Sequence, residues 1–351
     1  MLADVNSKPL LAVLCGRRPE KTPMWMMRQA GRHLPEYLEL RSRAKDFLDF
    51  CYTPSLATEA TLQPIRRYGM DGAILFADIL LVLDALGLGV RFEKGIGPIV
   101  ERIESVVDLE RRSAIAAADR LSPVYETVDR VRAQLPDETT LIGFAGAPFT
   151  VLLYAIEGRG KTDKSETRSW AYTKPDVLAA CLDKIVEVSA LYMAKQVEAG
   201  ANALMIFESW AEGLPDDVFK EVVIRPNAAL VKALRDLGVT VPIIGFPRGG
   251  GAMLSDYVAE TGVSAVGLDT SILPNQVNGV LPPDFPVQGH LDPLLLRAGG
   301  ARMVARTREL LAAYSARPHI FNLGHGVLPD TPIAHVEEVV KTVREWRADG
   351  P

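Results

Sequence analysis

The sequence predicts an α/β protein folded as a single (β/α)8 TIM barrel over residues 1–351, with a short N-terminal extension. Eight short apolar runs recur along the chain, a helical stretch follows most of them, and no segment has the composition of an interdomain linker. The runs are continuously apolar, as expected for parallel strands buried on both faces. A doubly wound sheet is the alternative, although the GxGxxG turn typical of it is absent.

The expected strands, in chain order, are 24–27, 73–76, 141–146, 203–209, 242–248, 265–269, 286–290 and 319–325. Apolar residues at helical spacing predict helices over 5–16, 54–68, 122–134, 175–199, 215–237, 300–314 and 332–347. Pro54 suits the first turn of its helix. Segments 91–118 and 157–174 are polar, and we expect irregular additions to the barrel there.

Composition limits the function. The net charge of −5 and the pI near 5.7 argue against a nucleic-acid-binding surface, which requires a basic patch. Three cysteines without CxxC spacing argue against a disulfide framework or a zinc cluster and favour a reducing compartment. The longest apolar run, 79–90, contains Asp84 and is shorter than the ~20 residues of a membrane span. We therefore expect a soluble, cytoplasmic protein that binds neither membrane nor nucleic acid.

In a (β/α)8 barrel, residues that follow the strands meet at one catalytic face. Here that set is cationic and polar, and in the N-terminal half of the chain it has one carboxylate close behind an apolar run, Asp78. Its members are Arg28, Arg32, Asp78, Ala147, Pro148, Ser209, Arg248, Asp269, His290 and His325.

Two arginines follow the first expected strand. Arg28 and Arg32 lie four residues apart in a segment interrupted by Gly31 and Pro35. A guanidinium group is always charged, and its fork of donors matches a carboxylate or phosphate. The pair therefore suggests a binding site for an anionic small molecule, although a solvated pair on a helix surface has the same spacing.

Four other residues have a functional and a structural interpretation. Asp78 either caps the helix that follows or stabilises a developing cation. His325 lies between two glycines, where it faces a ligand or caps the last helix. Tyr154 and Ser209 lie near strand ends, where core packing and capping are the simpler explanations.

Several activities lack their motifs. Ser209 has no GxSxG elbow, and no GxxxxGK[ST] phosphate loop is present. Glu157, Glu208 and Glu212 could form an acid–base pair for glycoside hydrolysis, but the sequence does not place them near one another.

Seven blocks of the chain resemble the uroporphyrinogen decarboxylase family, in the order found in that family. They are MRQAGRHLPEY (27–37), LFADIL (75–80), GFAGAPFTVLLYAIEG (143–158), IFESWAEGLP (206–215), GFPRGGG (245–251), VQGHLDP (287–293) and FNLGHGVLPDTP (321–332). The resemblance implies a (β/α)8 barrel, a homodimer with facing clefts, and no metal or organic cofactor. It also implies decarboxylation of the four acetate groups of uroporphyrinogen III to coproporphyrinogen III in heme biosynthesis.

The resemblance also implies roles for single residues. Asp78, Arg28 and Arg32 would be catalytic: Asp78 beneath the macrocycle, where it stabilises a protonated pyrrole, and the arginines on substrate carboxylates. Arg28 is sometimes assigned as proton donor, but a pKa above ~12 makes arginine a weak acid at neutral pH. The implied substrate-binding residues are Arg28, Gln29, Ala30, Gly31, Arg32, Asp78, Tyr154, Ser209 and His325.

Six positions depart from the family pattern: His33, Ala77, Glu212, Arg248, Thr270 and His290. Two alternatives to a decarboxylase stay open. A zinc-dependent methyltransferase of the same superfamily would need a His/Cys/Cys set at strand ends, which the three cysteines do not supply. A tetrapyrrole-binding protein without turnover would keep the arginines, although an intact Asp78 argues against it.

Overall fold

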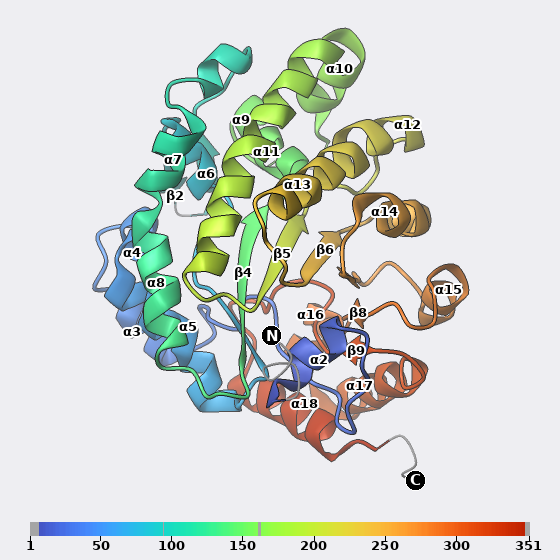
Figure 1. The fold of residues 1–351 in the computed structure, drawn as a ribbon. Coiled ribbons are helices and arrows are strands. Elements are labelled where there is room, and N and C mark those ends of the chain that lie inside the picture. Colours follow the sequence, from blue (N-terminus) through green and yellow to red (C-terminus); the bar gives the residue numbers. More distant parts are fainter. Residues whose placement is uncertain (1–6, 94, 161–162, 348–351) are drawn as a thin grey trace.

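At the centre of the computed structural model, which describes residues 7–93, 95–160 and 163–347, lies a curled parallel sheet. Its seven strands run in the order β1-β4-β5-β6-β7-β8-β9, and helices cover the outer face (Figure 1). The strands are β1 (Gly72–Ile74), β4 (Thr140–Gly146), β5 (Ala203–Glu208), β6 (Ile243–Pro247), β7 (Ala265–Gly267), β8 (Val287–Gln288) and β9 (His319–Ile320). Their carboxyl ends form one face, as the sequence predicts for a TIM barrel.

The expected first strand, 24–27, is reduced to a single bridge. Met24 pairs in parallel with Phe321 beyond β9, and its carbonyl accepts a 2.9 Å hydrogen bond from the N–H of Asp71, just before β1. Side chains provide the next hydrogen bond: the amide of Met27 donates to Oδ1 of Asn322 at 3.0 Å. The segment therefore joins the two edge strands, and the predicted α/β barrel is confirmed with a very short eighth member.

The outer helices follow the predicted periodicity closely. The structure contains α5 (Pro54–Tyr68), α8 (Ser122–Arg132), α11 (Pro175–Glu198), α17 (Gly300–Ala313) and α18 (Ile333–Glu345). The helix α2 (Pro9–Leu14) is shorter than predicted, and the first two residues of the predicted range lie outside the described residues.

The predicted helix 215–237 consists of three parts. These are α12 (Asp216–Phe219), the π-helical turn η2 (Lys220–Ile224) and α13 (Arg225–Asp236). Pro226, the second residue of α13, has no N–H to donate to Val222, four residues earlier. A π-type turn at that point accommodates the missing hydrogen bond.

The segments predicted as irregular contain regular elements, so that prediction was wrong. Within 91–118, β2 (Val90–Glu93) and β3 (Gly97–Val100) pair as an antiparallel hairpin, followed by η1 (Val106–Leu109) and the start of α7 (Ala114–Arg120). Within 157–174 lies α10 (Ser165–Thr173). The remaining helices are α3 (Pro35–Arg41), α4 (Phe47–Tyr52), α6 (Leu81–Leu86), α9 (Pro148–Glu157), η3 (Gly251–Met253), α14 (Leu254–Thr261), α15 (Pro274–Val280) and α16 (Pro293–Ala298).

Within the described residues, none of the helices combines the length and the apolar character that crossing a bilayer requires.

Candidate active site

A cavity of about 750 Å³ opens at the carboxyl ends of the barrel strands. Its walls come from the segment after Met24, from the ends of β1, β4, β5 and β6, and from α3, α4 and the β2–β3 hairpin. Of the predicted site residues, the structure places eight in this lining: Arg28, Ala30, Gly31, Arg32, Asp78, Tyr154, Ser209 and His325. Residues far apart in the sequence are therefore brought together as predicted.

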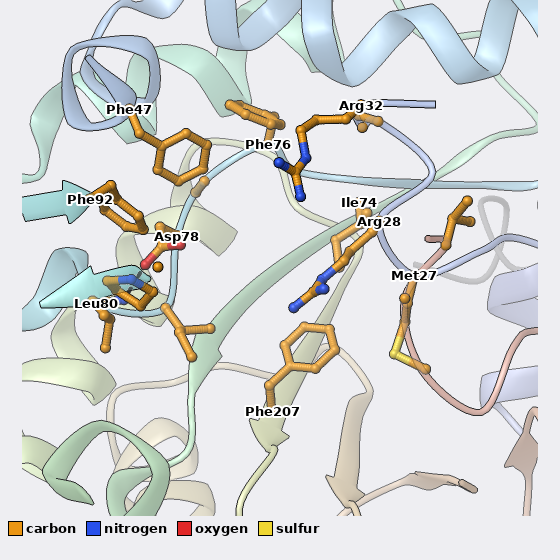
Figure 2. Close-up of a pocket in the computed structure, with 18 of the residues that line it drawn as sticks. Met27, Arg28, Arg32, Phe47, Ile74, Phe76, Asp78, Leu80, Phe92 and Phe207 are labelled. Carbon is orange, nitrogen blue, oxygen red and sulfur yellow. Dashed lines mark hydrogen bonds between the residues drawn. The ribbon is translucent and has the colours of Figure 1, made fainter. Parts of the chain in front are cut away.

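Arg28 and Arg32 extend from one loop with their guanidinium groups in the cavity (Figure 2). No carboxylate of the described residues forms an ion pair with either. Arg28 has φ +59°, a left-handed conformation that is unusual for a residue other than glycine. Gly326 makes room for its side chain, because a Cβ at that position would lie 2.2 Å from Cδ of Arg28. The two arginines are thus available to bind anions.

Asp78 is half-buried in the cavity wall. Its Oδ1 accepts a 2.8 Å hydrogen bond from the amide of Leu80, and Oδ2 has no hydrogen-bond partner among the described residues. Burial raises its pKa to about 6, although the hydrogen bond and the charge of Arg28 oppose the increase. The helix α6 begins at Leu81 with Leu80 as its N-cap, so Asp78 is not the helix cap that the alternative interpretation required.

His325 also faces the cavity. Its pKa is lowered to about 4, chiefly by burial and also by the charges of Arg28 and Arg248, while Asp269 opposes the decrease. The imidazole is therefore neutral at pH 7 and can donate or accept a hydrogen bond. It does not cap the last helix, because α18 begins at Ile333, with Pro332 as its N-cap.

Tyr154 and Ser209 form another part of the wall. Tyr154, on α9, packs edge-on against Trp210 with ring centroids 6.2 Å apart, and burial raises its pKa, so the phenol stays protonated. Ser209 directly follows β5, and its carbonyl accepts a 3.1 Å hydrogen bond from Nη1 of Arg248. Both residues belong to the cavity lining.

Gln29 differs from the prediction. Its side chain is buried, with Oε1 accepting from the amide of Met26 at 3.1 Å and Nε2 donating to the carbonyl of Gly72 at 3.0 Å. The residue does not belong to the cavity lining. Its side chain instead ties the arginine loop to β1.

The three glutamates considered for glycoside hydrolysis are also outside the lining. Glu157 accepts hydrogen bonds from Thr167, fully buried Glu208 from Thr150, and Glu212 pairs with Arg248. The carboxylates that do line the cavity are Asp78 and Glu93. The geometry therefore gives that alternative no support.

Metal-ligating groups are scattered. Cys15 is exposed, Cys51 and Cys181 are buried, and none of them lines the cavity. Over the described parts of the chain, no three His, Cys, Asp or Glu side chains are close enough to hold a metal ion. The cysteines thus do not supply the ligand set of the zinc-dependent alternative.

Sequence reasoning missed two parts of the site. Arg41 lines the cavity, with its guanidinium 5.8 Å from the ring centroids of Phe47 and Phe50. It lies one helical turn after Tyr37, another lining residue, and this spacing on α3 could have identified it. Phe92 completes an aromatic wall with Phe47, their rings 4.6 Å apart, but it lies on the hairpin that was not predicted.

Of the positions that depart from the family pattern, Ala77 lines the cavity. His33 is buried and stacks on Tyr68 with ring centroids 6.4 Å apart. His290 is also buried, and its Nε2 lies 2.9 Å from the hydroxyl of Tyr314. These two histidines therefore belong to the core and not to the site.

Comparison with known proteins decides the family. The family described as Uroporphyrinogen decarboxylase (URO-D) matches residues 6–346. The chain is 69% identical to a uroporphyrinogen decarboxylase of Hyphomonas neptunium over 96% of this chain and 98% of that protein. It is 50% identical to a uroporphyrinogen decarboxylase of Maricaulis maris over 97% and 99% of the two chains. The chain belongs to the uroporphyrinogen decarboxylase family.

Solved structures with the same fold are more distant. A methyltransferase from Methanosarcina mazei superimposes with a TM-score of 0.77 over 96% of this chain and 97% of that one, at 20% identity. A B12-independent methionine synthase from Shewanella reaches 0.52 over 82% and 86%, at 11% identity. At such identities the likeness shows the fold alone, while membership of the decarboxylase family rests on the sequence relatives.

Proposed function

We propose that this chain removes carbon dioxide from the four acetate side chains of uroporphyrinogen III and produces coproporphyrinogen III in heme biosynthesis. Relatives up to 69% identical over nearly the full chain carry the name of that enzyme. The observation that carries the mechanism is Oδ2 of Asp78, which has no hydrogen-bond partner among the described residues and lies in a cavity that also holds Arg28 and Arg32.

The reaction needs a place for the electron pair of the bond that breaks. In the proposed first step, a proton bonds to a pyrrole carbon, and the ring becomes cationic. The bond between the acetate CH2 and its carboxylate then breaks, carbon dioxide leaves, and the electron pair neutralises the ring. A second proton bonds to the exocyclic carbon and the ring returns its own proton, so that the acetate group becomes a methyl group.

Asp78 is suited to stabilise the cationic ring. Oδ2 can accept pyrrole N–H groups while the amide of Leu80 holds Oδ1 in place. Because the surroundings are poorly hydrated, attraction between the carboxylate and the cation is stronger than in water. Asp78 is thus an electrostatic catalyst, fixed in position before the substrate arrives.

Arg28 and Arg32 are suited to bind the carboxylates of the substrate through charge-assisted hydrogen bonds. Tyr154, Ser209 and His325 offer neutral polar groups, and Ala30 and Gly31 complete the same surface. Since the pyrrole ring itself accepts the electron pair, the proposed reaction needs neither a metal nor an organic cofactor.

Incubation with uroporphyrinogen III under reducing conditions, followed by chromatography of the oxidised products, tests the proposal. We expect stepwise loss of carboxyl groups until coproporphyrinogen III accumulates. Tight binding of uroporphyrinogen without any product would instead favour the non-catalytic tetrapyrrole-binding alternative. Stoichiometric zinc in the purified protein would favour the methyltransferase alternative.

We further propose that the enzyme works in the cytoplasm as a homodimer, as membership of the family suggests. Leu38, which lines the cavity mouth, and Ile96, in the turn of the β2–β3 hairpin, are apolar and about half exposed or more, at 49% and 57%. A second copy could cover them. Light scattering that gives the mass of one chain would refute the dimer.

A further inference from the structure

The loop that follows β5 carries Ser209 into the cavity lining and is held by cations from two neighbouring loops. Nη1 of Arg248, which directly follows β6, donates to the Ser209 carbonyl at 3.1 Å. Nζ of Lys164 donates to the Glu212 carbonyl at 2.8 Å. These two hydrogen bonds end on backbone carbonyls of the loop and do not involve the Glu212 carboxylate.

The carboxylate of Glu212 has a different partner. Its Oε2 lies 3.2 Å from Nη2 of Arg248, and the two side chains are 39% and 32% exposed. Gly249 permits this arrangement, because a Cβ there would lie 2.2 Å from Cβ of Glu212. An ion pair of this exposure is worth less than about 1 kcal/mol, because solvent screens it, so a bound anion can compete with Glu212 for Arg248.

The charge of Arg248 acts on the cavity. Ser209, whose carbonyl it contacts, and Phe246, two residues before it on β6, both belong to the lining. After burial, the charges of Arg28 and Arg248 both lower the pKa of His325, another lining residue. A carboxylate bound near Ser209 and His325 would therefore meet the field of Arg248 as well as that of Arg28.

We propose that Arg248 and Glu212 form a specificity-determining pair, in which Arg248 attracts substrate carboxylates and Glu212 limits that attraction. The inference rests on the proposed function, because the substrate loses one carboxylate at each decarboxylation. A site with excess positive charge would favour the more highly carboxylated porphyrinogens over the later ones. The pair balances affinity for the first substrate against affinity for the product.

The direction in which one substitution changes KM distinguishes this role from structural support of the loop. Glu212→Gln keeps the size of the side chain and an oxygen that can accept from Arg248, while the carbonyl bonds of the loop stay intact. If Glu212 limits the attraction, its loss lowers KM for uroporphyrinogen III. If the ion pair only supports the loop, its loss raises KM or leaves it unchanged.

The experiment measures KM and kcat for uroporphyrinogen III and the inhibition constant of coproporphyrinogen III, at low and high salt. We expect Glu212→Gln to lower KM by about two- to five-fold at low salt, with kcat within two-fold of wild type. The inhibition constant should change less, and high salt should remove the difference. Arg248→Gln should raise KM. Arg248→Lys keeps the positive charge, so its KM should stay close to that of the wild type.

Glu309→Gln on α17 is the matched control, because it removes the same charge from an ion pair with Arg306 on a helix outside the cavity. Glu309→Gln should leave KM for uroporphyrinogen III and the inhibition constant of coproporphyrinogen III unchanged. A raised or unchanged KM for Glu212→Gln, or an equal effect of Glu309→Gln, overturns the inference while wild-type turnover stands. Absence of wild-type turnover overturns the proposed function, and this inference with it.

Discussion

Replacing Asp78 by Asn tests the electrostatic centre of the proposed mechanism. The amide keeps the size of the side chain and an oxygen that can accept from the Leu80 amide, as Oδ1 does now at 2.8 Å. The turn before α6 should therefore form normally. Only the negative charge that would face the cationic pyrrole is lost.

The structure sets the scale of the effect. Burial raises the pKa of Asp78 from 3.8 to about 6, which corresponds to ~3 kcal/mol of unfavourable free energy for the bare charge. A cationic ring beside Oδ2 offsets this cost in the transition state. The pyrrole ring before protonation is neutral and does not offset it. We expect kcat to fall by about 10²-fold or more, the range seen when a preorganised stabilising group is removed.

The assay is coproporphyrinogen formation by chromatography, with thermal unfolding as the test of the fold. Asp292→Asn is the control, because Asp292 is also half-buried and its Oδ1 accepts from the amide two residues later, Leu294, at 2.8 Å. That variant should keep wild-type kcat. In the wild type, kcat/KM should fall below pH 6 as Asp78 protonates, and Asp78→Asn should lack this acidic limb. Near-normal turnover by a folded Asp78→Asn protein would refute the reasoning.

Three other predictions concern positions around the site and in the core. Gly326→Ala should displace the side chain of Arg28 and raise KM about tenfold with the fold intact. Gly279→Ala is the control, because a Cβ there would have no atom within 4 Å, and it should leave KM and the fold unchanged. A normal KM for Gly326→Ala would contradict the proposed role of Arg28. Arg41→Ala should raise KM for uroporphyrinogen and leave the thermal midpoint nearly unchanged; a large fall in that midpoint would assign Arg41 to the fold. Burial lowers the pKa of His319 to about 4, below its ordinary 6.5, so its contribution to stability is complete above pH 6.5 and decreases as the pH falls towards 4. Urea unfolding should show a loss of ~2 kcal/mol from this residue at pH 5, which His319→Gln should remove; an unchanged pH dependence would contradict the assignment.

The strand and helix periodicities were sufficient to predict the barrel. Continuous apolar runs identified β4, β5 and β6 almost to the residue, and the proline-started helix α5 matches its predicted bounds. These elements are buried against one another, so the positions of their apolar residues follow directly from the fold. Where local chemistry competes, as at Pro226 in the predicted helix 215–237, the pattern predicted one helix and the structure has three segments.

The β2–β3 hairpin could not be predicted in the same way. Of the residues in its two strands, most are half-exposed and only Val90 and Val100 are buried, so no alternation of buried and exposed side chains marks the strands. Packing of Phe92 against Phe47 places the hairpin over the cavity. That contact joins two segments that lie far apart in the sequence, and no pattern in either segment indicates it.

The residue types of the site were readable from the sequence, because strand ends of a (β/α)8 barrel meet at one face and the blocks around Arg28, Asp78 and His325 resemble one family. The sequence by itself determined the barrel, the family and most of the polar lining. Only the tertiary structure decided which of these side chains face the cavity, since that depends on burial and on partners distant in the chain. It directs Gln29 towards Gly72 and brings Glu212 onto Arg248.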